Sequence, residues 1–271
     1  MRFSIAILAV FSVFYLATSV PAIIVPAGES GVVYNCAYPF TVTLDGSFKD
    51  WPDVTWEKVD HTMGWSPLPP SDADGSLEFA CVADNDYLYV GILVKDNAKC
   101  VDENIGDDVY LDDSVEIYID GDNSKSSEYE ADVCQITTGR YNVNGDLNNP
   151  KLNNFRGLND KGAAAGETGT KVAVVDTDYG WAVEVAIPLT FFKIPPKDGT
   201  VIGFNVQLND DDDRDIRDHK LSWSKVEVEV KREEYSYYNP SVFGELKFVS
   251  TLSSVSSKGK LTATWGNVKS K

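Results

Sequence analysis

A short acidic segment near the middle of the chain, residues 113–123, carries side chains that could bind a polar ligand. Its sequence is Asp-Ser-Val-Glu-Ile-Tyr-Ile-Asp-Gly-Asp-Asn, in which apolar and polar residues alternate. A period of two predicts a half-buried β-strand, ended here by turn residues that tolerate positive φ. Glu116 stands at a polar position in mid-strand. A carboxylate there either points to water or meets a hydroxyl group or a cation, and we expect the function to depend on which.

Hydrolysis of a glycosidic bond is one chemistry that carboxylates such as Asp113, Glu116 and Glu184 could serve. It needs two carboxyl groups facing each other across a sugar, roughly 5–10 Å apart, one with a raised pKa. The sequence contains no Gly-x-Ser-x-Gly elbow, no His-Glu-x-x-His motif and no phosphate-binding glycine loop. We therefore expect a protein that is not an enzyme.

Two acidic stretches could bind a cation. Residues 120–123 (Asp-Gly-Asp-Asn) and 210–213 (four aspartates) offer the oxygen ligands that Ca²⁺ prefers. Neither matches the twelve-residue EF-hand loop, so solvated acidic turns are the alternative. The two histidines, His61 and His219, stand in polar contexts, and we expect both to be solvent-exposed loop residues.

The overall charge narrows the class of partner. The chain has 24 Lys and Arg against 42 Asp and Glu, a formal net charge of −18. Nucleic acids and anionic membranes need a basic surface, so we expect neither as a partner. A neutral ligand or a cation fits this balance better.

The N-terminus has the features of a secretory signal peptide, for which we expect residues 1–22. A basic Arg2 precedes an apolar run over residues 5–16, and small residues offer cleavage after Ser19 or Ala22. An uncleaved anchor is the alternative, but the run is short for a span of roughly 20 residues. We expect a secreted protein that does not engage a membrane after cleavage.

The cysteines add a second expectation for an exported chain. Their number is even, which favours two disulfides with three pairings that the sequence does not separate. They are Cys36, Cys81, Cys100 and Cys134. No Cys-x-x-Cys pair occurs, so neither a zinc ribbon nor a redox motif is supported.

Short strand patterns punctuated by turn signals run through most of the remaining chain. We expect a lead-in segment over residues 23–39, one β domain over 40–249, and a polar basic tail over 250–271. Hydrophobic residues make up 43% of the chain, which is enough for a core. The expected strands are residues 40–44, 77–82, 87–94, 115–119, 133–136, 171–175, 181–187, 201–208, 220–223 and 243–249. They predict an all-β fold, a single-domain antiparallel β-sandwich of jelly-roll or immunoglobulin-like type.

Seven ordered motifs resemble those of a known family. They are Asp-Gly at 45–46 with Trp51, and the stretches 84–90, 113–120, 180–188, 202–210, 221–223 and 239–244. Each is weak alone, but the ordered set is similar to family 9 carbohydrate-binding modules, the β-sandwiches appended to secreted xylanases. The resemblance implies a non-catalytic domain that clamps sugar rings between two aromatic side chains and binds their hydroxyls with polar ones. It also implies a structural calcium ion, without identifying its ligands.

The family's sugar-binding positions can be carried onto this sequence. The residues implied are Tyr110, Glu116, Gln207, Arg217 and Tyr237. Tyr110 and Tyr237 would form the aromatic clamp, with Tyr235 or Tyr238 as substitutes for the second ring. Each residue also has a structural alternative, such as a surface tyrosine or an amide that satisfies a neighbouring backbone group.

One departure from the family concerns its second sugar-binding arginine. That arginine aligns near Ile136 or Thr137 and is absent, and Arg140 could replace it only if the strand is shifted. We further expect Arg217 to hold Glu116, either as a structural ion pair or while both meet a sugar.

Together these observations predict a secreted, non-catalytic protein that binds β-linked plant-type polysaccharide (glucan or xylan), its oligosaccharides or its chain ends. A secreted glycoside hydrolase would be its protein partner. The alternatives are a structural or adhesive extracellular β-sandwich that has lost sugar binding, and an accessory part of a glycoside hydrolase system.

Overall fold

The computed structural model describes residues 33–62, 65–100, 106–140, 152–156, 168–213, 216–225 and 235–250. The expected signal peptide, and the expected tail beyond residue 250, lie outside the described residues. None of the helices in these ranges has the length and hydrophobicity that a membrane-spanning helix needs.

Strands and short 3-10 helices make up the regular structure of the described chain. In order they are β1 (Val33–Ala37), η1 (Phe48–Asp50), β2 (Glu57–Val59), β3 (His61–Thr62), β4 (Gly75–Ala83), β5 (Tyr87–Asp96), η2 (Gly106–Leu111), β6 (Ser114–Asp120), β7 (Val133–Gly139), β8 (Leu152–Arg156), β9 (Lys171–Thr177), β10 (Gly180–Pro188), β11 (Val201–Asp210), β12 (His219–Ser222), η4 (Pro240–Val242) and β13 (Gly244–Val249). The all-β prediction is confirmed.

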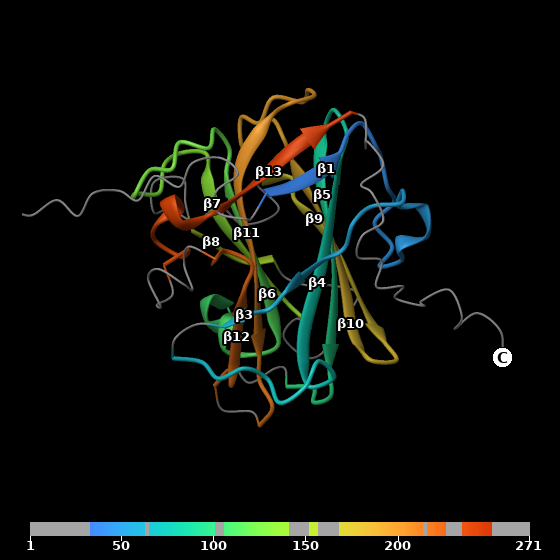
Figure 1. Ribbon diagram of the computed structural model, residues 1–271, viewed down its shortest axis with the longest axis vertical. Helices are drawn as coiled ribbons and strands as arrows, with labels where there is room; N and C mark the ends of the chain where they lie inside the picture. The colour runs from blue at the N-terminus through green and yellow to red at the C-terminus, as the bar shows by residue number, and fades with distance from the viewer. Residues whose placement is uncertain are drawn as a thin grey trace, which may run out of the picture.

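Hydrogen-bonded strands follow one continuous path, β8-β7-β6-β11-β13-β1-β4-β5-β10-β9. Figure 1 shows this path folded back on itself. Strands β6, β7, β8 and β11 form one layer, β4, β5, β9 and β10 form the other, and β13 and β1 run between them. Strand β12 pairs with β11 and β3, and β2 pairs with β4. The single-domain β-sandwich is confirmed.

Strand β1 departs from two expectations. It lies within residues 23–39, which we expected to be a lead-in, and it runs parallel to both neighbours, β13 and β4. Tyr34 and Cys36 bury their side chains while Asn35 between them is exposed, the alternation of a strand. Residues 40–44 alternate too but form no strand: the Phe40 N–H bonds Ala83 of β4, whereas the Thr43 N–H bonds the Asp50 carboxylate.

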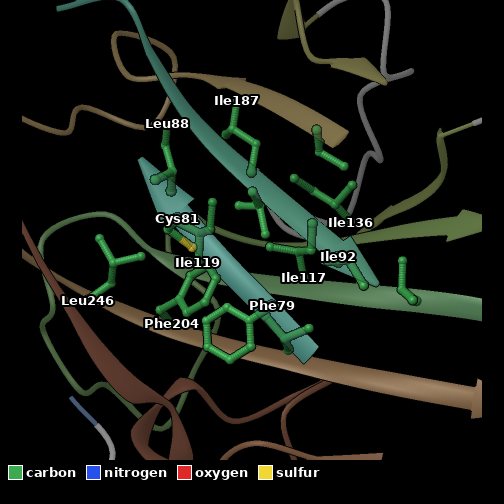
Figure 2. Packing of buried hydrophobic residues seen from close by; sticks show 14 of the residues in the cluster. Phe79, Cys81, Leu88, Ile92, Ile117, Ile119, Ile136, Ile187, Phe204 and Leu246 are labelled. Carbon is green, nitrogen blue, oxygen red and sulfur yellow. The ribbon is translucent and has the colours of Figure 1, made fainter. Parts of the chain in front are cut away.

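The core lies between the two layers and is made by the apolar face of each strand. Figure 2 shows side chains of β4 and β5 packed against those of β6 and β11. The Phe79 ring centroid lies 5.7 Å from that of Phe204 and 5.2 Å from that of Trp223, so one β4 side chain contacts two elements of the other layer. Such aromatic contacts add to the stabilisation from burial.

All four cysteines are free and buried, so the prediction of two disulfides is wrong. Cys36, Cys81 and Cys134 lie on β1, β4 and β7 and belong to the apolar core. Burial raises the pKa of each of these three thiols, which keeps them protonated and unreactive. A domain with a core of this size does not depend on disulfides for stability, unlike small secreted domains.

The histidines are not exposed loop residues either. His61 lies in β3 and is partly buried, while His219 begins β12 and is buried. The polar sequence around His219 suggested a loop, but its ring is packed where Asp74 and Asp212 approach it from outside β12.

The contacts of Phe79 predict a large effect of truncation. The variant Phe79→Ala should lower the free energy of unfolding by ~3–5 kcal/mol, because it leaves a cavity between the layers. Denaturant titration measures this change. Leu68→Ala is the control: its side chain is 59% exposed, so we expect a change within about 0.5 kcal/mol. Equal effects in the two variants would contradict the role of Phe79.

Candidate functional site

The face of β6 and β11 that points away from the core is polar but buried. Strand register places Ser114 opposite Asn209, Glu116 opposite Gln207, and Tyr118 opposite Asn205. Lys220 and Ser222 of β12 continue the row beyond Asn209 and Gln207. Every one of these side chains is buried. Strand β6 is therefore buried on both faces, not half-buried as its alternation suggested; the alternation separates an apolar face from a polar one.

Glu116 is the centre of this polar face. The Lys220 ammonium lies 2.8 Å from its Oε2, the Asn209 amide donates to its Oε1 over 2.9 Å, and the Tyr118 hydroxyl donates to Oε2. Burial alone would raise the pKa of Glu116, but attraction to Lys220 and then Arg217, with the hydrogen bonds, lowers it to about 2. The carboxylate is therefore ionised and held in place at neutral pH.

Arg217 reaches this centre through Asn209, which corrects the expectation that it pairs with Glu116 directly. Its guanidinium donates to Asn209 Oδ1 over 2.8 Å, the same oxygen that accepts from the Lys220 ammonium over 2.7 Å. Lys220 is the direct ionic partner of Glu116. The reason is register: β12 lies beside β11, which lies beside β6, so the lysine opposite Asn209 reaches the carboxylate first.

Aromatic rings border Arg217. Its Cζ lies 5.1 Å from the ring centroid of Tyr110 and 5.0 Å from that of Trp65, distances that fit cation–π contacts. Trp65 is half exposed and Tyr110 is partly buried. The structure thus places Tyr110 beside Arg217, another of the implied residues, and adds Trp65, which the sequence did not assign to this region.

Tyr237, the other predicted clamp ring, lies on an exposed turn. It is 38% exposed and packs edge-on against Tyr238, with ring centroids 4.6 Å apart. Tyr235 instead packs against the buried cluster of Tyr118 and Phe243. The clamp role of Tyr237 stays a prediction.

Gln207 and β7 supply further polar groups beside Glu116. Two contacts of the Gln207 amide are long: its Oε1 lies 3.3 Å from the Tyr118 hydroxyl, which also donates to Glu116, and its Nε2 donates to Ser222 over 3.5 Å. Thr137 lies opposite Glu116 and Gln135 opposite Tyr118. Thr137 Oγ1 and Gln135 Oε1 are buried without a hydrogen-bond partner. Each such atom costs about 1–3 kcal/mol, which a ligand hydroxyl could recover.

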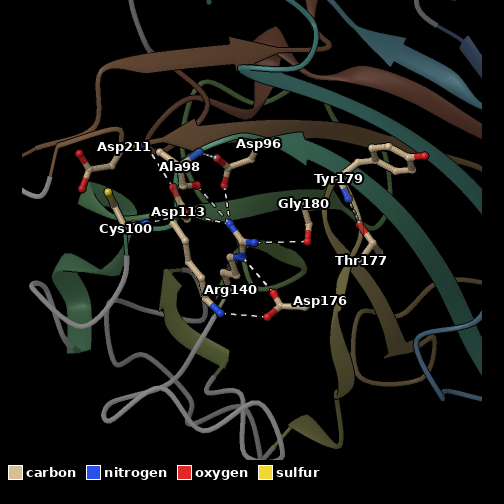
Figure 3. A network of polar contacts seen from close by, with 11 residues as sticks. Asp96, Ala98, Cys100, Asp113, Arg140, Asp176, Thr177, Tyr179, Gly180 and Asp211 are labelled. Atoms are coloured by element: carbon tan, nitrogen blue, oxygen red, sulfur yellow. Dashed lines mark hydrogen bonds and ion pairs between the residues drawn. The ribbon is translucent and has the colours of Figure 1, made fainter.

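Arg140 does not replace the missing arginine. Figure 3 shows it in a different network, where it contacts three aspartates. Its guanidinium lies 2.6 Å from Asp96, 3.4 Å from Asp113 and 3.2 Å from Asp176. The residue that faces Glu116 from β7 is Thr137, so this part of the site carries a hydroxyl in place of a cation.

Asp96 and Asp113 also belong to a buried acidic cluster with Asp210. One carboxylate oxygen from each lies within 4.8 Å of the others. Burial, followed by repulsion from Asp96, raises the pKa of both Asp113 and Asp210 to about 9. Asp210 Oδ2 has no hydrogen-bond partner, and a Cβ at position 75 would lie 2.5 Å from it, so Gly75 makes room for this carboxylate. The cluster is an all-oxygen site that could hold a hard cation.

The two acidic stretches that were predicted to bind a cation contribute to different carboxylate groups in the structure. Asp210, from 210–213, joins the buried cluster above. From 120–123, Asp122 instead groups with Glu130 and Asp132, and both Asp122 and Glu130 are exposed.

Several site residues escaped sequence reasoning. They are Lys220, Asn209, Tyr118, Ser222, Thr137, Gln135 and Trp65. The spacing along the strands could have identified two of them, because residues two positions apart point to the same face of a strand. Tyr118 is two positions from Glu116, and Asn209 is two positions from Gln207. No such signal existed for Trp65, which comes from a loop.

Residues 44–251 match the family described as "Carbohydrate family 9 binding domain-like", and the chain belongs to that family. Family membership confirms the resemblance that the ordered motifs suggested.

Relatives and solved structures agree with this assignment. The chain is 29% identical over 219 residues to endo-1,4-beta-xylanase A of Thermotoga neapolitana and 32% identical over 204 residues to exoglucanase XynX of Acetivibrio thermocellus, covering 81% and 73% of this chain. It spans only 18% and 16% of those two proteins. A family 9 carbohydrate-binding module from Caldicellulosiruptor kristjanssonii, solved with cellotriose, is 21% identical with a TM-score of 0.60, covering 82% of this chain and 96% of that one. This likeness shows the fold.

The burial of Lys220 predicts a large cost for removing its charge. Lys220→Met should lower the free energy of unfolding by ~3–5 kcal/mol, because it leaves the Glu116 carboxylate buried and unpaired. Denaturant titration at neutral pH measures this. The matched control is Lys58→Met, which breaks the exposed pair with Asp72 and should change stability by at most about 1 kcal/mol. A Lys220 effect no larger than the Lys58 effect would refute the structural role of the pair.

Proposed function

We propose that the protein is an exported, non-catalytic module that binds β-linked glucan or xylan, or the ends and oligosaccharides of these chains. One observation carries the proposal: unpartnered, buried oxygens of Thr137 and Gln135 stand beside an ionised Glu116. A sugar offers a row of hydroxyl groups, each of which can donate and accept, and such a row would satisfy these atoms.

The Glu116 carboxylate keeps acceptor capacity for a sugar hydroxyl. A carboxylate has about four lone-pair sites. Lys220, Asn209 and Tyr118 donate to three of them. The remaining site can accept from a ligand, and Gln207 can exchange one of its two long contacts, with Tyr118 or Ser222, for a ligand hydroxyl.

Aromatic rings supply the second half of sugar recognition, since a pyranose has apolar C–H faces. Tyr110 and Trp65 lie at Arg217, at the more exposed end of the polar row. We assign Tyr110 as one stacking ring and propose Tyr237 as the other. Trp65 is the alternative to Tyr237, favoured by its contact with Arg217.

The choice of ligand class follows from relatives. Structures of the Caldicellulosiruptor kristjanssonii module hold cellotriose and glucose, and the similar curated proteins are xylanases and an exoglucanase. Family membership supports binding in place of catalysis. The predicted signal peptide and the net charge of −18 support export and argue against nucleic acid as a partner. A secreted glycoside hydrolase that acts on the same polysaccharide is the proposed protein partner.

Affinity electrophoresis in xylan, glucan and mannan gels, with calorimetry on cellobiose and xylobiose, tests this function. Retardation in glucan or xylan is the expected result. No retardation and no calorimetric signal would reject sugar binding and leave a structural or adhesive role. Release of reducing sugar by the pure protein would show an enzyme.

The aromatic assignment gives a sharper prediction. Tyr110→Ala should weaken sugar binding by at least ~1–3 kcal/mol, about 5- to 150-fold, because a stacking surface is lost. Calorimetry compares it with Tyr237→Ala and Trp65→Ala, of which one should show a similar loss. Tyr179→Ala, on an exposed turn between β9 and β10, is the control and should bind like the wild type. Unchanged affinity in all three site variants would reject the aromatic clamp.

We also propose one structural Ca²⁺ held by Asp96, Asp113 and Asp210. Among the described residues, Arg140 is the cation in direct contact with these buried carboxyl groups. Burial and mutual repulsion raise the pKa of Asp113 and Asp210 to about 9, and Asp210 Oδ2 lacks a donor. A hard cation would supply both the charge and the ligand contact. Its role would be to tie together the ends of β5 and β11 and the start of β6.

The raised pKa of Asp210 predicts how stability changes with pH. In chelator-treated protein the native state holds a proton on Asp210 up to about pH 9, whereas the unfolded chain loses it near pH 4. The free energy of unfolding should therefore fall as pH rises from about 4 to 9. Saturating Ca²⁺ should raise stability at the alkaline end and flatten this slope.

Asp210→Asn tests the origin of the slope. Chelated Asp210→Asn should show a shallower decline between about pH 4 and 9 and no gain from Ca²⁺. Asp178→Asn removes one charge from an exposed turn and is the matched control. If Asp178→Asn and Asp210→Asn behave alike, the cation site is not at Asp210.

A further inference from the structure

We propose that His219, Asp74 and Asp212 form a binding site for a divalent transition-metal ion such as Zn²⁺. The site lies where the segment before β4 meets the β11–β12 connection. It is separate from the all-oxygen cluster of Asp96, Asp113 and Asp210. The proposal does not depend on sugar binding.

The histidine is oriented as metal-binding histidines are. Its Nδ1 lies 3.0 Å from the Pro67 carbonyl oxygen, which only accepts, so Nδ1 carries the proton. Nε2 then presents its lone pair, and it faces the two carboxylates. A backbone carbonyl that fixes the tautomer through the other ring nitrogen is the usual second contact of a metal-bound histidine. The His219 side chain is only 9% exposed.

The spacing of the three ligand atoms fits an ion better than it fits an ion pair. Nε2 lies 4.0 Å from Asp74 Oδ2 and 3.9 Å from Asp212 Oδ2, and all three atoms lie within 4.8 Å of one another. Both separations exceed the roughly 2.7–3.2 Å of an N–H···O hydrogen bond. Ligands about 2.1 Å from a shared Zn²⁺ are about 3.4 Å apart in a tetrahedron, so small side-chain shifts would complete the site.

The carboxylates are held for this role. Asp74 Oδ2 is buried without a hydrogen-bond partner, while the other oxygen of Asp74 accepts from the Asn97 amide. The Asp212 backbone N–H donates to Asp218, which fixes the start of the β11–β12 connection. An orphaned oxygen aimed at an imidazole nitrogen is costly unless a cation joins them.

Ligand type selects the metal. Ca²⁺ and Mg²⁺ take oxygen ligands, whereas an imidazole nitrogen with two carboxylates suits Zn²⁺ and its neighbours. The chain would therefore have an all-oxygen site that suits a hard cation and a second site, with His219 as a nitrogen ligand, that suits a transition-metal ion. Metal at the second site would link residues 65–75 to β12, the strand that carries Lys220.

Calorimetry with ZnCl₂ on chelator-stripped protein, in saturating Ca²⁺, tests the site. The wild type should bind one equivalent of Zn²⁺, and His219→Gln should bind at least 10-fold more weakly. His61→Gln, the matched control, changes the other histidine, whose Nδ1 lies 3.2 Å from Asp60, and should bind like the wild type. Equal affinity of wild type and His219→Gln, or no Zn²⁺ binding by the wild type, would overturn the proposal.

Two further measurements keep the test decisive. Asp212→Asn changes the most exposed of the three ligands and should also lose at least 10-fold in affinity, whether or not His219→Gln folds. Co²⁺ substitution should give visible ligand-field bands without thiolate-to-cobalt charge transfer. Thiolate bands would assign the metal to the cysteines and refute the site.

Discussion

The buried ion pair between Glu116 and Lys220 depends on three strands being in one register. Glu116 lies opposite Gln207, and Asn209, two residues further along β11, lies opposite Lys220. The pair therefore runs diagonally across β11, with Asn209 bonded to both charges. A slip of one residue would turn Glu116 into the apolar core and leave two unpaired charges in a region from which water is excluded. Register and ion pair thus stabilise each other, and the polar face exists because both hold.

The fold could be read from the sequence wherever its signals are local. Expected strands at 115–119, 201–208 and 220–223 correspond to β6, β11 and β12, because alternation and turn residues act over a few positions. The polar face was only partly predictable: the sequence pointed to Glu116 and to Tyr110 near it, but not to Lys220, the ionic partner of Glu116. Its partnership with Glu116 depends on which strands become neighbours and in what offset, which no local pattern encodes.

Two further predictions, the disulfides and the lead-in segment before the first strand, failed because they rested on general context and not on a local pattern. An even number of cysteines in a chain expected to be exported favoured disulfides, yet Cys36, Cys81 and Cys134 fill apolar core positions on three strands. Strand β1 was missed because a five-residue strand at a domain's start has little pattern of its own. Its parallel pairing with β13 joins the first and last strands of the described domain, which no local sequence pattern encodes.

Part of the strong negative charge of the chain is concentrated at one end of the sandwich. Antiparallel strands place the start of one beside the end of the next, so Asp74 before β4, Asp96 at the end of β5, Asp113 before β6 and Asp210 at the end of β11 converge on one end of the sandwich. Arg140 contacts Asp96 and Asp113, and the repulsion among these groups contributes to the raised pKa of Asp113 and Asp210. In the proposed arrangement two cations of different preference would share this end. Strand β12 begins at His219 and continues with Lys220. The same strand would therefore connect the two proposed cation sites to the polar face on which the proposed sugar binding depends.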